Sequence, residues 1–229
     1  MKLGILGGMG PYATVCFYER IVKKTPANSD QEHIDTIILS HASMPDRTSV
    51  ILNGDSEELF EAVKRDLRLF EAAGCSYIAI PCNTFHYFYD DVANMTNIEV
   101  LNMVETAVEK AESKFGFGSK IAVLGTNGTI KSGVYKEQFK KSGLEYYELD
   151  EKRQERVMEV IYQVKSTNIV VQPVIDELIE EMIRTKEADG IILACTELSS
   201  IEYSTKYIDK TVDAMDELVD LSIRKCLNK

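Results

Sequence analysis

A glycine-rich turn followed at a distance by a cysteine occurs twice in this sequence, and this internal repeat limits the possible folds more than any other feature. In the first half, LGILGGMG is followed by an apolar segment that ends in Cys-Asn-Thr at Cys82. In the second half, IAVLGTNG is followed by an apolar segment that ends in Cys-Thr-Glu at Cys195. We therefore predict two similar halves. Each would place a glycine turn and a cysteine at the carboxyl ends of parallel strands, where ligands of open α/β sheets bind.

Apolar segments and amphipathic helices alternate along the whole chain. The apolar segments have no polar face, which is typical of parallel sheets covered by helices on both sides. Strands are predicted in KLGIL, HIDTIILSHA, YIAIPCNT, NIEV, KIAVLG, LEYYELD and GIILACTEL. Helices are predicted at about 12–24, 55–74, 132–142, 151–186 with a new start at Pro173, and 211–226, and another follows the short strand in NIEVLNMVETAVEKAESK. The predicted fold class is α/β, with two pseudo-symmetric Rossmann-like domains, parallel sheets, and an active site in the cleft between them.

The predicted domain boundary lies in the middle of the chain. No linker rich in proline, glycine or serine separates the halves, and SKFGFGSK is the best candidate for the crossover. We expect an N-terminal α/β domain at 1–112 and a C-terminal α/β domain at 113–210. A C-terminal helix at 211–229 is expected to pack back onto the first domain.

The charge of the chain restricts its partners. A formal net charge of −11 argues against nucleic acid or an anionic membrane, because both require a basic surface. No apolar run approaches the roughly 20 residues that span a bilayer, and the N-terminus has no signal-peptide cleavage pattern. We expect a soluble cytoplasmic protein whose five cysteines are free thiols.

Two cysteines at the ends of equivalent strands can form an acid and base pair. Asn83, Thr84 and Thr196 follow them and are residue types favoured at helix N-caps, where the helix dipole favours a thiolate. A thiolate on one face of a carbon centre and a thiol on the other can remove one proton and return another. Such a pair inverts a stereocentre without a cofactor. The alternative is that Cys82 and Cys195 are buried structural cysteines.

Four motifs together resemble the cofactor-independent aspartate/glutamate racemase superfamily, and most closely its aspartate racemase branch. They are GILGGMGPYAT at 4–14, PCNTFHYFYD at 81–90, LGTNGTIKSGVY at 124–135 and IILACTELS at 191–199. The resemblance covers nearly the whole chain. It implies a homodimeric racemase of an acidic amino acid, aspartate first and glutamate second. It further implies that Cys82 and Cys195 are the two catalytic bases, with no cofactor and no metal.

The resemblance also implies two cationic anchors for the substrate. Arg47, in MPDRTSVILNG, and Lys165, in IYQVKS, match family segments whose basic residues bind substrate carboxylates. A dicarboxylic amino acid needs two such groups, and a guanidinium binds a carboxylate bidentately. The sequence departs from the family pattern at Phe85, where a small residue is usual, and a phenyl ring in the pocket would reshape it. Further expected substrate contacts in the same turns are Met9, Asn83, Thr84, Thr126 and Thr196.

Three other functions stay open. GGMGPYA is a variant of the dinucleotide-binding fingerprint, but the second strand ends at Ser40 instead of an acidic residue, and Pro11 removes a backbone donor. The two cysteines would also suit a thiol redox or regulatory protein. A related isomerase or decarboxylase acting on a small diacid is the third alternative.

Several nearby side chains have less certain roles in this pattern. We expect a hydrogen-bonding role for His86, because the cysteine pair already supplies both acid and base. Glu197 either orients the thiol of Cys195 or caps the following helix, and the sequence leaves both roles open. We expect Cys16, Cys75 and Cys226 to be structural.

Overall fold

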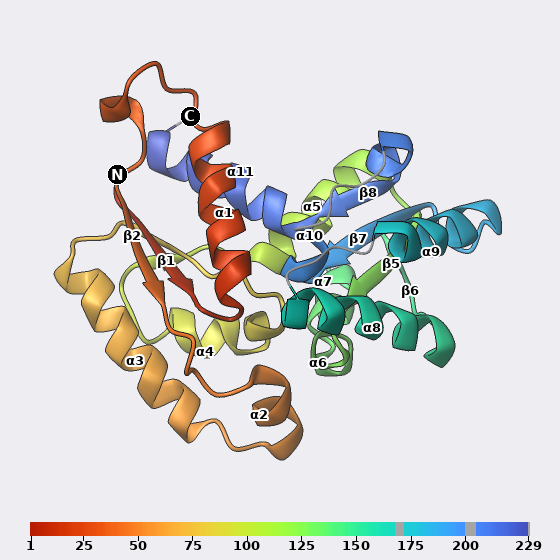
Figure 1. The fold of residues 1–229 in the computed structure, drawn as a ribbon, viewed down its shortest axis with the longest axis horizontal. Coiled ribbons are helices and arrows are strands. Elements are labelled where there is room, and N and C mark those ends of the chain that lie inside the picture. The colour runs from red at the N-terminus through yellow and green to blue at the C-terminus, as the bar shows by residue number, and fades with distance from the viewer. Residues whose placement is uncertain (168–171, 200–204, 229) are drawn as a thin grey trace. The chain divides into compact units, whose positions relative to one another are not determined.

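The computed structural model describes residues 1–167, 172–199 and 205–228 (Figure 1). The chain divides into two compact units, which are described separately. Unit 1 comprises Met1–Met103 and Leu218–Lys229, and unit 2 comprises Val104–Glu217. Both divisions fall inside helices, at the start of α5 (Met103–Phe115) and within α11 (Ala214–Leu227).

Unit 1 is built on a parallel sheet whose strand order is β2-β1-β3-β4. The strands are β1 (Leu3–Gly7), β2 (Thr36–Ser40), β3 (Tyr77–Ala79) and β4 (Glu99–Val100). The helices between them are α1 (Pro11–Lys24), α2 (Arg47–Asn53), α3 (Glu57–Ala72) and α4 (Tyr89–Ala93). The start of α1 uses Pro11, whose fixed φ suits a first helical position.

Unit 2 repeats this plan with the strand order β6-β5-β7-β8. Its strands are β5 (Lys120–Gly125), β6 (Glu145–Tyr147), β7 (Gly190–Ala194) and β8 (Thr211–Asp213). Its helices are α6 (Asn127–Ser132), α7 (Val134–Phe139), α8 (Glu151–Thr167), α9 (Gln172–Arg184) and α10 (Thr196–Ser199). The common order confirms the predicted α/β class and the predicted repeat, because in both units the first strand pairs with the second and the third.

This shared strand order creates a switch point in each sheet. The chain leaves the first strand toward one edge and returns to its other side as the third strand. Ligands of open α/β sheets bind where the order reverses in this way. The glycine turns follow β1 and β5, and the cysteines follow β3 and β7, so both predicted motifs lie at the switch points.

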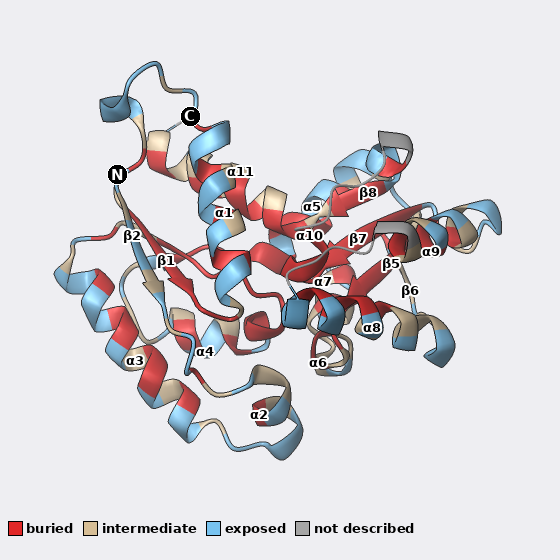
Figure 2. Ribbon diagram, in the orientation of Figure 1, coloured by how far each residue is buried: buried red, intermediate tan, exposed pale blue. Residues whose placement is uncertain are grey.

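Opposite faces of the unit 1 sheet are covered by different helices (Figure 1). Gly4 of β1 packs against the ring of Phe70 in α3, whereas Gly7 packs against Thr14 in α1. Residues three apart on a strand face opposite sides, so α3 and α1 cover opposite faces. Figure 2 shows β1, β5 and β7 buried, as expected for central parallel strands.

Some predicted element boundaries were wrong. The last helix starts at Ala214 rather than 211, because Thr211–Asp213 pair with β7 as strand β8. The helix predicted at 132–142 spans only Val134–Phe139, and the preceding segment, predicted as a turn, forms helix α6, which ends before Gly133 at a positive φ of 72°. The short helices at Arg47–Asn53 and Thr84–Phe88 were not predicted. Strand β2 is only partly buried because it forms an edge of its sheet.

None of the helices within the described residues combines the length and the apolar character that a membrane crossing requires.

Candidate active site: two equivalent half-sites

The glycine turn after β1 packs closely against its own unit. Gly8 has a φ of 91°, and a Cβ at this position would overlap the backbone of His41. The Gly8 N–H donates a hydrogen bond of 2.9 Å to Thr14 Oγ1. Gly7 and Gly8 let the turn pack on α1 and on the end of β2. Because Gly8 already donates to Thr14, its amide does not serve as a free phosphate donor.

Cys82 lies three residues after β3 and is 7% exposed. The imidazole of His86 bridges two backbone groups beside it. Its Nε2 accepts the N–H of Met103 at 3.0 Å, so its Nδ1 carries the proton and donates to the Cys82 carbonyl oxygen at 2.9 Å. Burial lowers the pKa of His86, which favours the neutral ring. His86 therefore has the hydrogen-bonding role that was predicted, and it fixes the backbone at Cys82.

The residues after each cysteine do not cap helices as expected. Asn83 holds the N-cap position of the 3₁₀ turn at Thr84–Phe88, but its side chain makes no capping hydrogen bond. In unit 2, the carbonyl of Cys195 accepts the N–H groups of Leu198 and Ser199, so the cysteine itself begins the helical turn.

Arg47 begins α2 on the loop that follows β2. Its Nη1 donates to the carbonyl oxygens of Met44 at 3.2 Å and Pro45 at 2.9 Å, which hold the guanidinium in place. Its Nε is buried and has no hydrogen-bond partner among the described residues. A buried N–H donor without an acceptor is rare in proteins. The free N–H of Arg47 would suit an anionic ligand.

A histidine–carboxylate pair lies at the end of β2. His41 Nδ1 and Asp66 Oδ2 of α3 are 2.6 Å apart, and the side chain of His41 is partly exposed. The Met44 N–H donates to the His41 carbonyl, which links this pair to the loop that carries Arg47. Asp66 lies within a helical pattern of the sequence, which carries no signal of this contact.

Phe85 and Met9 belong to the apolar core of unit 1. Phe85 is 1% exposed and contacts the ring of Phe88, and Met9 is 4% exposed in the same cluster. Phe85 thus replaces the small residue of the family with a side chain that fills the core. The assignment of Met9 to substrate binding stays a prediction.

In unit 2, Cys195 forms a chain of polar contacts with two charged residues. Its Sγ donates a hydrogen bond of 2.9 Å to Glu197 Oε2, and both residues are buried. The other oxygen of Glu197 lies 3.8 Å from Nζ of Lys165 on α8. Lys165 and Cys195, selected separately from the sequence, are therefore connected through Glu197, whose contact with the thiol agrees with the orienting role.

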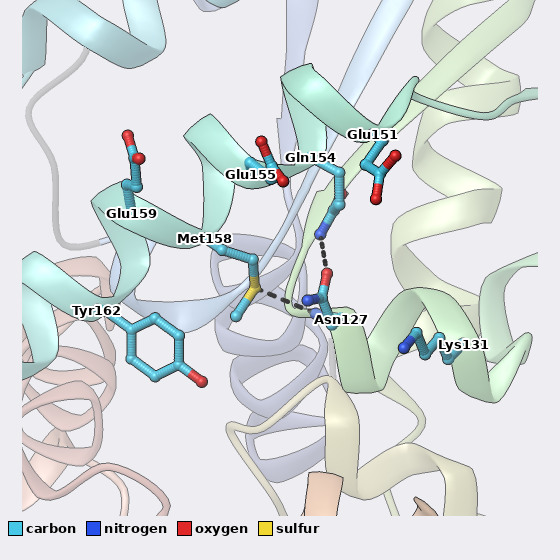
Figure 3. Close-up of a pocket in the computed structure, with 8 residues that line it drawn as sticks. All are labelled: Asn127, Lys131, Glu151, Gln154, Glu155, Met158, Glu159 and Tyr162. Atoms are coloured by element: carbon cyan, nitrogen blue, oxygen red, sulfur yellow. Dashed lines mark hydrogen bonds between the residues drawn. The ribbon is translucent and has the colours of Figure 1, made fainter.

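The turn after β5 is held by its own side chains. Thr126 caps α6, since its Oγ1 accepts the N–H of Thr129 at 3.1 Å. Gln154 of α8 donates to the carbonyl of Gly125 and to Oδ1 of Asn127, both at 2.9 Å. A pocket of about 480 Å³ opens beside this turn (Figure 3). It is lined by Asn127, Lys131, Glu151, Gln154, Glu155, Met158, Glu159 and Tyr162.

The three cysteines outside the repeat differ in burial. All five are free thiols. Cys75 and Cys226 are buried as expected, whereas Cys16 is only partly buried on α1. Within the described residues, no group of three or more histidine, cysteine or acidic side chains is arranged to hold a metal ion.

The fold and the two half-sites define a class of α/β protein in which two parallel sheets of the same topology each present a cysteine at the switch point. Residues 6–221 match the Asp/Glu/Hydantoin racemase family. The chain belongs to this family, and it is an amino-acid racemase.

Individual relatives agree with this assignment. The broad specificity amino-acid racemase RacX of Bacillus subtilis is 30% identical over 207 residues, which cover 87% of this chain and 86% of RacX. The structure of Picrophilus torridus aspartate racemase matches with a TM-score of 0.83 and 28% identity, covering 100% of this chain and 94% of the other. An aspartate racemase homologue from Pyrococcus horikoshii has the same fold, with a TM-score of 0.80, 21% identity, and coverage of 100% and 99%.

Proposed function

We propose that this protein racemises an acidic amino acid, aspartate first and glutamate second, with Cys82 and Cys195 as the two bases and without a cofactor. The observation that carries the proposal is the equivalent placement of the cysteines, each after the third strand of its unit. Both thiols are buried at the sheet edge where α/β proteins bind ligands. A structural role alone gives no reason for this repetition.

The chemistry needs one thiolate and one thiol on opposite faces of the α-carbon. The thiolate takes the α-proton, so an S–H bond forms, the C–H bond breaks, and the electron pair passes into the neighbouring carboxylate. The second thiol then gives its proton to the opposite face and becomes the thiolate. Cations and backbone donors that stabilise the enediolate-like charge lower the barrier.

The choice of an acidic substrate rests on two cationic side chains. The buried Nε of Arg47 has no acceptor among the described residues, which suits a substrate carboxylate. Lys165 supplies a second cation in unit 2, near Cys195 through Glu197. The relative from Picrophilus torridus is an aspartate racemase, which supports aspartate as the first substrate to test.

Chiral chromatography tests this function directly. The protein is incubated in D₂O, with a thiol reductant and without added cofactor, with L-aspartate, L-glutamate, L-alanine and L-lysine. We expect D-aspartate that carries deuterium at Cα. Cys82→Ala and Cys195→Ala should each lower the rate by about 10²–10⁴-fold, the usual contribution of an acid or base group.

Cys75→Ala is the matched control, because Cys75 is also buried but stands two residues before β3, near its amino end, whereas Cys82 and Cys195 follow the carboxyl ends of their strands. This variant should racemise at the parent rate. Equal rates on alanine or lysine would refute the preference for acidic substrates. If either Cys82→Ala or Cys195→Ala keeps the parent rate, the two-base assignment is wrong, and release of CO₂ would indicate a decarboxylase instead.

A further inference from the structure

The two cysteines of the repeat have different neighbours at equivalent positions. Two residues after Cys82 stands Thr84, whereas two residues after Cys195 stands Glu197. The repeat therefore places a neutral hydroxyl in one half-site and a carboxylate in the other. Glu197 is 7% exposed, so its charge acts on Cys195 with little screening by water.

The geometry of this contact depends on the proton of the thiol. An ionised carboxylate only accepts hydrogen bonds, so the 2.9 Å contact between Cys195 Sγ and Glu197 Oε2 uses the S–H as donor. Loss of that proton would place a thiolate and a carboxylate side by side in a buried site. Like charges at this distance repel strongly in such surroundings.

Burial raises the pKa of the Cys195 thiol well above its usual value, and the Glu197 carboxylate raises it further. The Lys165 ammonium and the backbone N–H of Glu197 lower the pKa of this thiol, but their combined effect is smaller than that of burial and the carboxylate. Two other titratable groups face this region. Tyr135 of α7 interacts with Cys195 and Asp213, and Asp213 of β8 accepts the hydroxyl of Ser199.

We infer that Glu197 is a positioning residue that keeps Cys195 in the thiol form in the resting protein. Cys195 is then the resting proton donor of the pair. This assignment rests on the proposed two-cysteine mechanism. In one inversion, Cys82 takes the α-proton, and Cys195 gives its proton to the opposite face of the α-carbon. The product form carries a thiolate beside Glu197, and proton exchange with water restores the resting form.

The test measures the thiol itself and needs no substrate. The ultraviolet absorbance of thiolates is titrated against pH, and the curve of the matching Cys195→Ser protein is subtracted to isolate Cys195. Glu197→Gln keeps the shape of the side chain and removes its charge. We expect the midpoint of the Cys195 titration to fall by about one pH unit or more in this variant. Glu197→Thr, which copies Thr84, should move it in the same direction.

Glu155→Gln is the matched control, because Glu155 is an exposed glutamate on α8. This variant should leave the midpoint of the Cys195 titration unchanged. Lys165→Met provides a second measurement that does not alter Glu197, and it should move the titration up. Circular dichroism confirms that each protein is folded. An unchanged or upward titration in folded Glu197→Gln would overturn the inference, as would a downward movement in Lys165→Met.

The outcome is independent of the racemase assay. If the titration moves as expected but no amino acid is racemised, the proposed function fails and the control of the Cys195 thiol by Glu197 stands. If racemisation depends on both cysteines but the titration does not respond to Glu197, the proposed function stands and the inference fails.

Discussion

At the scale of single residues, hydrogen-bond partners decide which side chains can move protons. His86 lies four residues after a catalytic candidate, yet both of its ring nitrogens are occupied by backbone groups. Cys195 has an acidic partner at hydrogen-bond distance, whereas the corresponding position after Cys82 is a threonine. Similar motifs therefore place different side chains beside the two cysteines.

The buried ring of His86 predicts a loss of stability in acid. Its pKa is lowered by burial, whereas a histidine in the unfolded chain titrates near 6.5. Above that pH both states are neutral and the contribution is fully present. As the pH falls below it, the unfolded chain binds the proton first, and the free energy of unfolding drops by up to about 1.4 kcal/mol per pH unit. Urea denaturation at pH 7.5 and pH 5 should show this drop.

His86→Gln is the comparison for this measurement. Glutamine can still hydrogen-bond but does not titrate, so the difference between pH 7.5 and pH 5 should be smaller than in the parent. The remaining acid sensitivity, from other groups, should be common to both proteins. An equal difference in the two proteins would contradict the role assigned to His86.

At the scale of elements, the turn between β1 and α1 depends on a glycine that has no room for a side chain. Gly8→Ala would force a positive φ on alanine and push its Cβ into the backbone of His41. We expect a loss of about 1–3 kcal/mol in the free energy of unfolding, measured by urea denaturation. Gly54→Ala has a similar positive φ but open space around it, so it should lose less. Equal losses would mean that close packing at Gly8 contributes nothing.

At the scale of the whole molecule, unit 1 exposes an apolar stripe on α1. Tyr12, Val15, Tyr18 and Val22 recur at helical spacing, and Val15 is 62% exposed. An exposed apolar stripe of this kind is typical of an interaction surface. We propose that a second copy of this chain covers it, in agreement with the homodimer that the family resemblance implies.

Sedimentation velocity tests the proposed dimer. The parent protein should sediment as a dimer, and Val15→Glu should shift it toward monomer, because a buried unpaired charge opposes association. Leu69→Glu is the control, since Leu69 is equally apolar and exposed on α3. A monomeric parent protein, or a Val15→Glu protein that stays dimeric, would refute this interface.

Local pattern was enough to predict most of the fold. The alternation of apolar segments and helices, the glycine stops and the repeat predicted two α/β units, because burial and helix termination depend on residues close in sequence. The three-residue strand β8 was missed, since Thr211–Asp213 gain their strand conformation only by pairing with β7. Helix α6 (Asn127–Ser132) was missed, since its asparagine, glycine and threonine residues are typical of a turn.

The sequence by itself determined the fold class, the repeat and the placement of two cysteines after equivalent strands, since these follow from periodicity and from motif position. Only the tertiary structure decided the strand order that puts each cysteine next to a glycine turn. It also decided the bridge made by His86, the buried unpaired Nε of Arg47, and the carboxylate that holds the thiol of Cys195. These features depend on contacts and burial created by folding, and a linear pattern carries no direct record of which side chains meet.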